Sequence, residues 1–286
     1  RIGLPMNVEF LMILSTRVKL VVISLAISLC AHGCASSGLL GKLKLNSAEY
    51  LYQSGLLDLE DGLYPEAVKS FSTIKSKFPY SVLARLADLR ISDTYFAQGK
   101  YGDAIGSYRR FLKYNPDHRE AAYALFQIGE SHFERVPGDW WFLPPAAEKD
   151  QAKVKQAIAA YKNLLAQHAS GPYPELGRKR LRLCRKKLAD HELYVADFYF
   201  SRAHYKAAAG RAEKLLSDYP GLGLELKAIW IAAQSRIATD EPTLARPLLE
   251  RVLKEFPKSE QAEQARAKLA ALPTAESSSE PAPESP

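Results

Sequence analysis

Six histidines are the residues best suited to bind a metal ion or move a proton, and they are scattered along the chain. They are His32, His118, His132, His168, His191 and His204. None stands in an HExxH motif or beside a closely spaced pair of cysteines, the patterns that hold zinc. A glycine-rich phosphate loop ending in GKS or GKT is also missing from the sequence. We therefore predict a non-enzyme without catalytic residues, metal site or cofactor.

A cysteine near the N-terminus is placed for a different chemistry. Arg17 and Lys19 precede the uncharged apolar run 20–29, which is too short to cross a bilayer comfortably and has the layout of a secretory signal. The pair Gly33-Cys34 then resembles the lipobox of bacterial lipoproteins, in which cleavage of the signal leaves a cysteine to be lipidated. An ordinary signal followed by a chance cysteine is the alternative.

On this interpretation residues 1–33 are a signal peptide and residues 34–46 a lipidated tether. The motif departs from the usual pattern, because Ala31 stands where leucine is common. Ala35 follows the cysteine, in place of the aspartate that commonly retains lipoproteins at the inner membrane. We expect a lipid-anchored protein on the periplasmic face of the outer membrane.

Cys184 has no obvious partner once Cys34 is acylated, although cysteines in an oxidising compartment normally pair. It lies on an apolar stripe with Leu181 and Leu188. We interpret Cys184 as a packing residue of the core.

The charge of the chain is modestly positive, at +7. Three cations and one anion precede Cys34, so the remainder carries two charges fewer, or +5. Such a surplus favours acidic partners or anionic headgroups. It is densest in GRKRLRLCRKK, residues 177–187, where a solvated helix face and a contact with acidic protein or lipid are both open interpretations. We expect no nucleic-acid partner, because an exported protein meets little nucleic acid.

The segment VPGDWWFLPP at 136–145 holds three adjacent aromatic residues. They can cover the neighbouring helices, dock a partner, or lie at a membrane interface, which aromatic residues favour. The sequence leaves these alternatives open.

The helices that must position these residues are predicted by a pattern of residue types at fixed spacing, which we call the frame and which occurs five times. In one copy Ala104 is followed by Tyr108, by Phe111 and Leu112, and then by Pro116. Apolar positions at i, i+4, i+7 and i+8 mark one face of an amphipathic helix, and the proline ends it. The other copies begin at Ala67, Ala157, Ala208 and Ala245, and the copy at Ala157 has Ala169 in place of the proline.

The alanines are 37, 53, 51 and 37 residues apart, which is closest to the tetratricopeptide repeat of about 34 residues. A helix pair of this kind cannot bury its apolar stripe alone, so successive copies stack. We predict an all-α fold, a right-handed superhelical solenoid of about five tetratricopeptide-like helix pairs over residues 47–272. The tail 273–286 is rich in proline, serine and glutamate and is predicted to be disordered.

The order of these features resembles the BamD (ComL) family of outer-membrane protein assembly lipoproteins. A signal and lipid cysteine precede five repeats, an insertion splits the third, and a long charged helix opens the fourth. The most specific stretch is 189–220, with its tyrosine cluster and Arg211 within GRAE.

The resemblance implies a periplasmic scaffold of the barrel assembly machinery that assists insertion of β-barrel proteins. Its partners would be the barrel insertase BamA, other Bam lipoproteins and unfolded outer-membrane protein precursors. Repeats four and five would dock BamA, with Arg211 and Tyr205 as contact residues. A lipoprotein repeat scaffold for pilus or cell-wall assembly is the alternative.

A peptide groove is expected along the first helices of repeats one to three, where aromatic residues can anchor an extended peptide with an aromatic end. The candidate groove residues, taken from helical periodicity, are Tyr50, Ser54, Leu57, Arg90, Tyr95 and Phe126.

Overall fold

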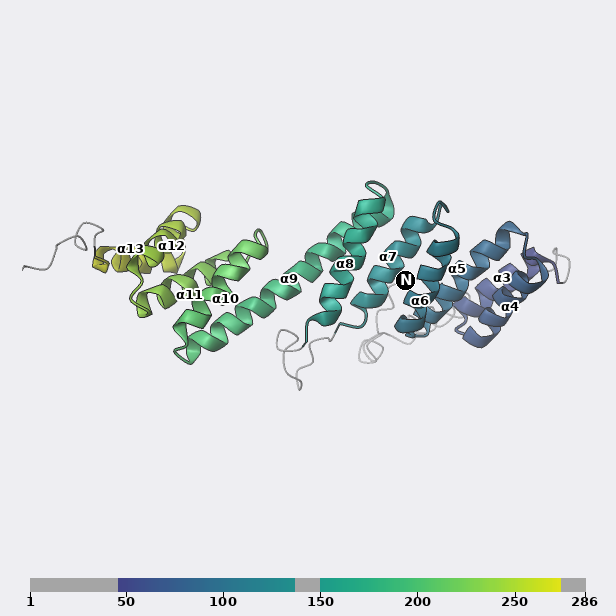
Figure 1. Ribbon diagram of the computed structural model, residues 1–286, viewed down its shortest axis with the longest axis horizontal. Helices are drawn as coiled ribbons and strands as arrows, with labels where there is room; N and C mark the ends of the chain where they lie inside the picture. Colours follow the sequence, from purple (N-terminus) through teal and green to yellow (C-terminus); the bar gives the residue numbers. More distant parts are fainter. Residues whose placement is uncertain (1–45, 137–149, 274–286) are drawn as a thin grey trace, which may run out of the picture. The chain divides into compact units, whose positions relative to one another are not determined.

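The computed structural model describes residues 46–136 and 150–273, and all regular elements in these two ranges are α-helices (Figure 1). The eleven helices are α3 (Ala48–Glu60), α4 (Tyr64–Lys77), α5 (Val82–Ala97), α6 (Tyr101–Tyr114), α7 (Ala121–Phe133), α8 (Ala152–Gln167), α9 (Pro172–Ser201), α10 (Tyr205–Asp218), α11 (Glu225–Ala238), α12 (Pro242–Glu255) and α13 (Glu260–Ala271). In chain order they make five pairs and a final helix, which confirms the all-α repeat prediction. The right-handed twist of the array stays a prediction.

The recurring frame forms the buried stripe of the second helix in every pair. The residues at its first three positions are at most 1% exposed in all five copies. They are Ala67, Phe71 and Ile74; Ala104, Tyr108 and Phe111; Ala157, Tyr161 and Leu164; Ala208, Ala212 and Leu215; and Ala245, Leu249 and Val252. Burial of one stripe per helix is what makes each helix depend on its neighbours.

The prolines of the frame set the ends of the second helices. Each of α4, α6, α10 and α12 is followed by one cap residue and then by proline, because the residue before a proline is disfavoured in helical geometry. Helix α8 ends at the same point of the frame without a proline, and its cap residue His168 donates from its backbone to the carbonyl of Leu164 at 2.9 Å. At its start, the Asp150 carboxylate accepts a hydrogen bond from the Ala152 backbone at 3.0 Å.

The described chain divides into two compact units, one ending at Thr94 and the other beginning at Tyr95. In the first unit α3 packs on α4. A Cβ atom on Gly55 would lie 2.9 Å from the Phe71 ring, so the absence of a side chain permits this approach. The Tyr52 ring meets the same phenylalanine edge to face, with centroids 5.8 Å apart.

In the second unit each helix from α6 to α13 packs on the next one along the chain. Helix α9 has 30 residues and also contacts α7 and α11 (Figure 1). It therefore carries two separate cores, one with α7 and α8 around Cys184 and Leu188, and one with α10 and α11 around Ala189 and Ala196. Within the two described ranges no helix is both long and apolar enough to cross a membrane.

Candidate functional site

The turn between α9 and α10, which we call the α9–α10 corner (residues 192–214), gathers aromatic and charged side chains. The chain reverses at Ala203, which takes a φ of 59°. The backbone of His204 then donates to the carbonyl of Tyr199 at 2.9 Å and closes the end of α9. This tight turn brings the last turn of α9 beside the first turn of α10.

Aromatic side chains cover this turn. The rings of Phe200 and Tyr205 meet edge to face with centroids 5.6 Å apart. The guanidinium of Arg202 lies 3.7 Å from the centre of the Phe198 ring, which is 40% exposed. A cavity of about 520 Å³ opens beside Tyr199, Tyr205 and their neighbours. Half-exposed aromatic residues and arginine are the types that anchor protein interfaces.

A buried carboxylate organises the charged side of the corner. Glu192 on α9 is 7% exposed, and its Oε2 accepts a hydrogen bond from Nη1 of Arg211 on α10 at 3.0 Å. Its Oε1 accepts a second, short hydrogen bond from the ammonium of Lys214. The two cations are 42% and 47% exposed, so each pairs with Glu192 while presenting part of its side chain to solvent.

The pairing outweighs the cost of burial for this carboxylate. Burial alone raises the pKa of Glu192, but the hydrogen bonds and charges of Lys214 and Arg211 bring the pKa below its usual value. The same carboxylate raises the pKa of Lys214. Glu192 is therefore ionised at neutral pH and holds α9 and α10 together.

Sequence reasoning missed Glu192 and Lys214. The available signal was Glu192 itself, which lies at i+4 from Leu188 and at i−4 from Ala196 on the buried face of α9. A charged residue at such a position needs a partner, because an unpaired buried charge is costly.

A second ion-pair network fixes α10 to α11. Arg236 donates to both carboxylate oxygens of Glu213, from Nε at 2.8 Å and from Nη2 at 2.7 Å. Its Nη1 donates to Glu241 at 2.6 Å. The fork of Arg236 therefore connects α10, α11 and the turn before α12, so α10 is positioned from both sides.

Most of the cations in the basic run of α9, residues 177–187, bind other parts of this chain. Five of the run's seven cations have partners within the chain. Arg180 pairs with the buried Glu130 of α7 at 2.7 Å, while Arg182 and Arg185 donate to the carbonyls of Gly221 and Asp218. These arginines attach α9 to α7 and to the turn before α11, which leaves little of the run for an external polyanion.

Cys184 is a core residue, as predicted. It is fully buried in a cluster with Tyr161 and Leu164, and burial raises the pKa of its thiol to about 12. The hydroxyl of Tyr161 donates to Glu130 at 2.5 Å. The buried hydroxyl of Tyr161 and the buried carboxylate of Glu130 thus satisfy each other, and the raised pKa keeps the thiol of Cys184 protonated.

Four of the predicted groove residues lie in the first unit. Tyr50, Ser54 and Leu57 occupy one face of α3 and are half-buried. Arg90 donates to the Tyr52 hydroxyl at 3.1 Å and pairs with Asp93 one turn further on. The charge of Arg90 is therefore already balanced within α5.

The other two groove residues belong to the second unit. Tyr95 is half-buried near the end of α5. Phe126 is a core residue, 9% exposed and packed against Tyr161 and Tyr173. Its assignment to the groove is corrected, because α8 and α9 both cover the face of α7 on which it lies.

Cys34, the aromatic residues of 137–145 and all but the first residue of the predicted tail 273–286 lie outside the described residues. Within the described ranges no group of three or more His, Cys, Asp or Glu side chains is arranged to hold a metal ion.

Stacked helix pairs with an alanine, large apolar and proline frame define a tetratricopeptide-type helical repeat protein. A tetratricopeptide repeat family matches residues 227–259. The family described as outer membrane lipoprotein, YfiO, matches residues 45–238, and this chain belongs to that family.

Curated relatives carry the name outer membrane protein assembly factor BamD. The relative from Neisseria gonorrhoeae is 25% identical over 252 residues, which covers 84% of this chain and 92% of the relative. The relative from Vibrio cholerae serotype O1 is 25% identical over 187 residues, covering 65% of this chain and 78% of the relative. The relative from Xylella fastidiosa is 26% identical over 202 residues, covering 69% and 68%.

Proposed function

We propose that this protein is a non-enzymatic scaffold for outer-membrane protein assembly and that it docks the barrel insertase BamA through the α9–α10 corner. Family membership over residues 45–238 and the name shared by the relatives support the process. The observation that carries the docking site is the arrangement at Glu192, where a buried carboxylate holds two half-exposed cations on the corner that also carries the exposed Phe198 ring.

The scaffold is anchored at the periplasmic face of the outer membrane by lipid on Cys34. The apolar run and lipobox-like pair before Cys34 support this assignment, together with the family description as outer membrane lipoprotein. Unfolded barrel precursors bind the first repeats, where Tyr50, Ser54 and Leu57 share one face of α3.

Copurification tests the proposal. Tagged protein is recovered from detergent-solubilised membranes of the bacterium that encodes it, and the associated proteins are identified by mass spectrometry. We expect a BamA-type insertase and other Bam lipoproteins. Recovery of pilus or cell-wall assembly proteins in their place would replace the proposed function by the alternative.

A matched pair of variants tests the docking site. Arg211→Gln and Lys214→Gln each remove one hydrogen bond to Glu192 and leave the other, so their effects on stability should be alike. We expect Arg211→Gln to lower the recovery of the insertase severalfold, whereas Lys214→Gln retains it, because the proposal assigns the contact to Arg211. Truncating a desolvated interfacial charge costs roughly 2–5 kcal/mol, against at most about 1 kcal/mol for an exposed pair. Unchanged recovery with Arg211→Gln, at an unchanged melting temperature, would move the interface elsewhere.

A further inference from the structure

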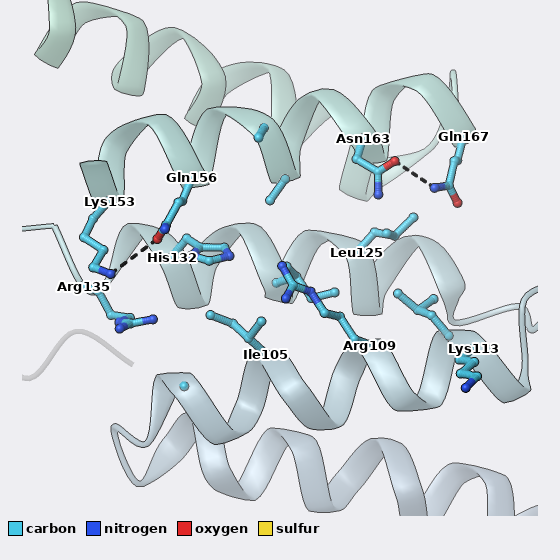
Figure 2. A pocket seen from close by; sticks show the side chains of 15 residues that line it. Ile105, Arg109, Lys113, Leu125, His132, Arg135, Lys153, Gln156, Asn163 and Gln167 are labelled. Atoms are coloured by element: carbon cyan, nitrogen blue, oxygen red, sulfur yellow. Dashed lines mark hydrogen bonds between the residues drawn. The ribbon is translucent and has the colours of Figure 1, made fainter. Parts of the chain in front are cut away.

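A groove between α6, α7 and α8 is lined by charges of one sign. Its volume is about 800 Å³, and it lies wholly within the second unit. The lining cations are Arg109 and Lys113 from α6, Arg135 from the end of α7 and Lys153 from α8 (Figure 2). No aspartate or glutamate is among the lining residues, and none of these four cations forms an ion pair with a described residue.

A buried histidine adds to this groove a polar atom without a partner in the part of the chain that the structure describes. His132 on α7 is 7% exposed, and its Nδ1 has no hydrogen-bond partner among the described residues. The ring lies at the groove near Gln156 and Arg135, as Figure 2 shows. A buried polar nitrogen without a partner is uncommon in folded proteins, so this one marks a place where a ligand can bind.

The groove is elongated, and apolar and polar side chains alternate along it. Its residues on α8 run from Lys153 to Gln167, which corresponds to about 21 Å of helix. Arg135 and Lys153 lie at one end and Lys113 at the other, with Ile105, Arg109 and Leu125 between them (Figure 2). Cations at both ends of a groove of this length are too widely spread for one phosphate or one lipid headgroup.

We propose that this groove binds an extended acidic peptide segment of a partner protein. About six residues of extended chain span 20 Å. Acidic side chains at the two ends of such a segment reach the cations there, and apolar side chains between them contact Ile105 and Leu125. The positive charge of the groove therefore favours an acidic peptide as its occupant. The groove shares no lining residue with the α9–α10 corner, so this proposal stands apart from insertase docking.

Fluorescence anisotropy with a defined probe tests the proposal on the full purified chain. The probe is the labelled octapeptide EEVAVAEE, and its control is the glutamine version QQVAVAQQ. We expect saturable binding of the first, with affinity that falls as salt rises, and at least tenfold weaker binding of the second. Equal binding of the two peptides would overturn the proposal.

Lys153→Gln has a matched control on its own helix. Lys155 is exposed, lies two residues further along α8 and does not line the groove. We expect Lys153→Gln to weaken binding of the acidic peptide about fivefold, the effect of losing about 1 kcal/mol, while Lys155→Gln leaves it unchanged. Equal weakening by both variants would mean diffuse attraction to a basic surface and would overturn the proposal.

His132 supplies a second readout. Burial lowers the pKa of its ring most, and Arg109 of α6, Arg135 at the end of α7 and Lys153 of α8 lower the pKa further, against the opposing effect of a hydrogen bond with Gln156 of α8. An acidic ligand opposes these cations and favours the protonated ring, so affinity for the acidic peptide rises as pH falls from 8 to 6. We expect this rise to be lost in His132→Gln, with the circular dichroism of the variant unchanged. Retention of the full rise would overturn the proposed site.

Competitors separate peptide from other anions. Inorganic phosphate and phosphatidylglycerol vesicles are titrated against the bound acidic peptide. We expect no displacement by phosphate at millimolar concentration beyond that of chloride at equal ionic strength, and no vesicle binding that depends on Lys153. Specific displacement by phosphate would make the groove a small-anion site, and Lys153-dependent vesicle binding would make it a lipid site. Either result would overturn the proposal.

Discussion

Glu192 shows how one buried carboxylate can join two helices and still leave charge at the surface. Both of its oxygens accept hydrogen bonds, from Arg211 and from Lys214 across the α9–α10 turn. The cations are satisfied by Glu192 on one side and by solvent on the other. The ion pairs of Glu192 therefore join α9 to α10 and also leave cationic side chains that the proposed partner can contact.

Glu192→Gln should destabilise the second unit in a pH-dependent way. The folded-state pKa of Glu192 lies below the ordinary 4.5, so its stabilisation is present above pH 4.5 and is lost as pH falls through the folded-state pKa. We expect the variant to lose about 1.5–3 kcal/mol of unfolding free energy at pH 7, the contribution of hydrogen bonds to a charged group. Urea unfolding from pH 7 to pH 3.5 should show the difference from the natural chain shrinking. A constant difference would contradict this assignment.

His132 should make stability depend on pH in a higher range. Its folded-state pKa lies below the ordinary 6.5, because the ring is buried among cations. The unfolded chain therefore binds a proton before the folded chain does, and stability falls as pH drops below 6.5. Denaturant midpoints measured between pH 8 and pH 5 should fall in the natural chain and fall less in His132→Gln. Parallel curves would place the titrating group elsewhere.

At the scale of helices, glycines mark where two axes approach closely. A Cβ atom on Gly129 of α7 would lie 2.3 Å from the ring of Tyr161 on α8. Tyr161 cannot easily move, because it is fully buried and its hydroxyl is bonded to Glu130. The small residue here is a packing requirement, like Gly55 against Phe71 in the first unit.

Two glycine substitutions should therefore have opposite signs. Gly129→Ala is expected to destabilise the chain by about 1–3 kcal/mol through overpacking. Gly106→Ala, on the exposed face of α6 with no atom near the added methyl group, should stabilise it by about 0.5–1 kcal/mol through helix propensity. Thermal unfolding of both variants checks the prediction. Destabilisation by Gly106→Ala would show a contact at that face.

At the scale of the whole molecule, the proposed function requires attachment to a membrane. The described helices contain no segment that could span one, and Cys34 is the proposed point of attachment. A single acyl chain binds a bilayer only marginally, whereas two or more chains hold firmly.

Cys34→Ala should abolish that attachment. We expect the variant to accumulate as uncleaved precursor in the inner membrane or as a soluble product, because the acyl chains cannot be added. Membrane fractionation and mass spectrometry of the N-terminus measure the outcome. Cleaved Cys34→Ala protein that stays in the outer membrane when insertase binding is disrupted would refute the anchor.

The sequence by itself determined the helical repeat. The spacing of Ala104, Tyr108 and Phe111 and its four copies identified three buried residues in each second helix, because a stripe at i, i+4 and i+7 is a local property of one helix. The helix ends followed from the prolines for the same reason. The long helix α9 and the core position of Cys184 could also be predicted from one segment of chain.

Only the tertiary structure decided which charged side chains pair with one another and which residues beside the buried stripes are covered by neighbouring helices. Arg211 meets Glu192 from 19 residues away, and Arg180 meets Glu130 from 50 residues away. Phe126 proved to be core because α8 and α9 lie over it, and the cations of the groove assemble from three helices. Helical periodicity identifies the buried face of a helix, but it carries no information about which polar edge of a neighbouring helix will lie beside that face.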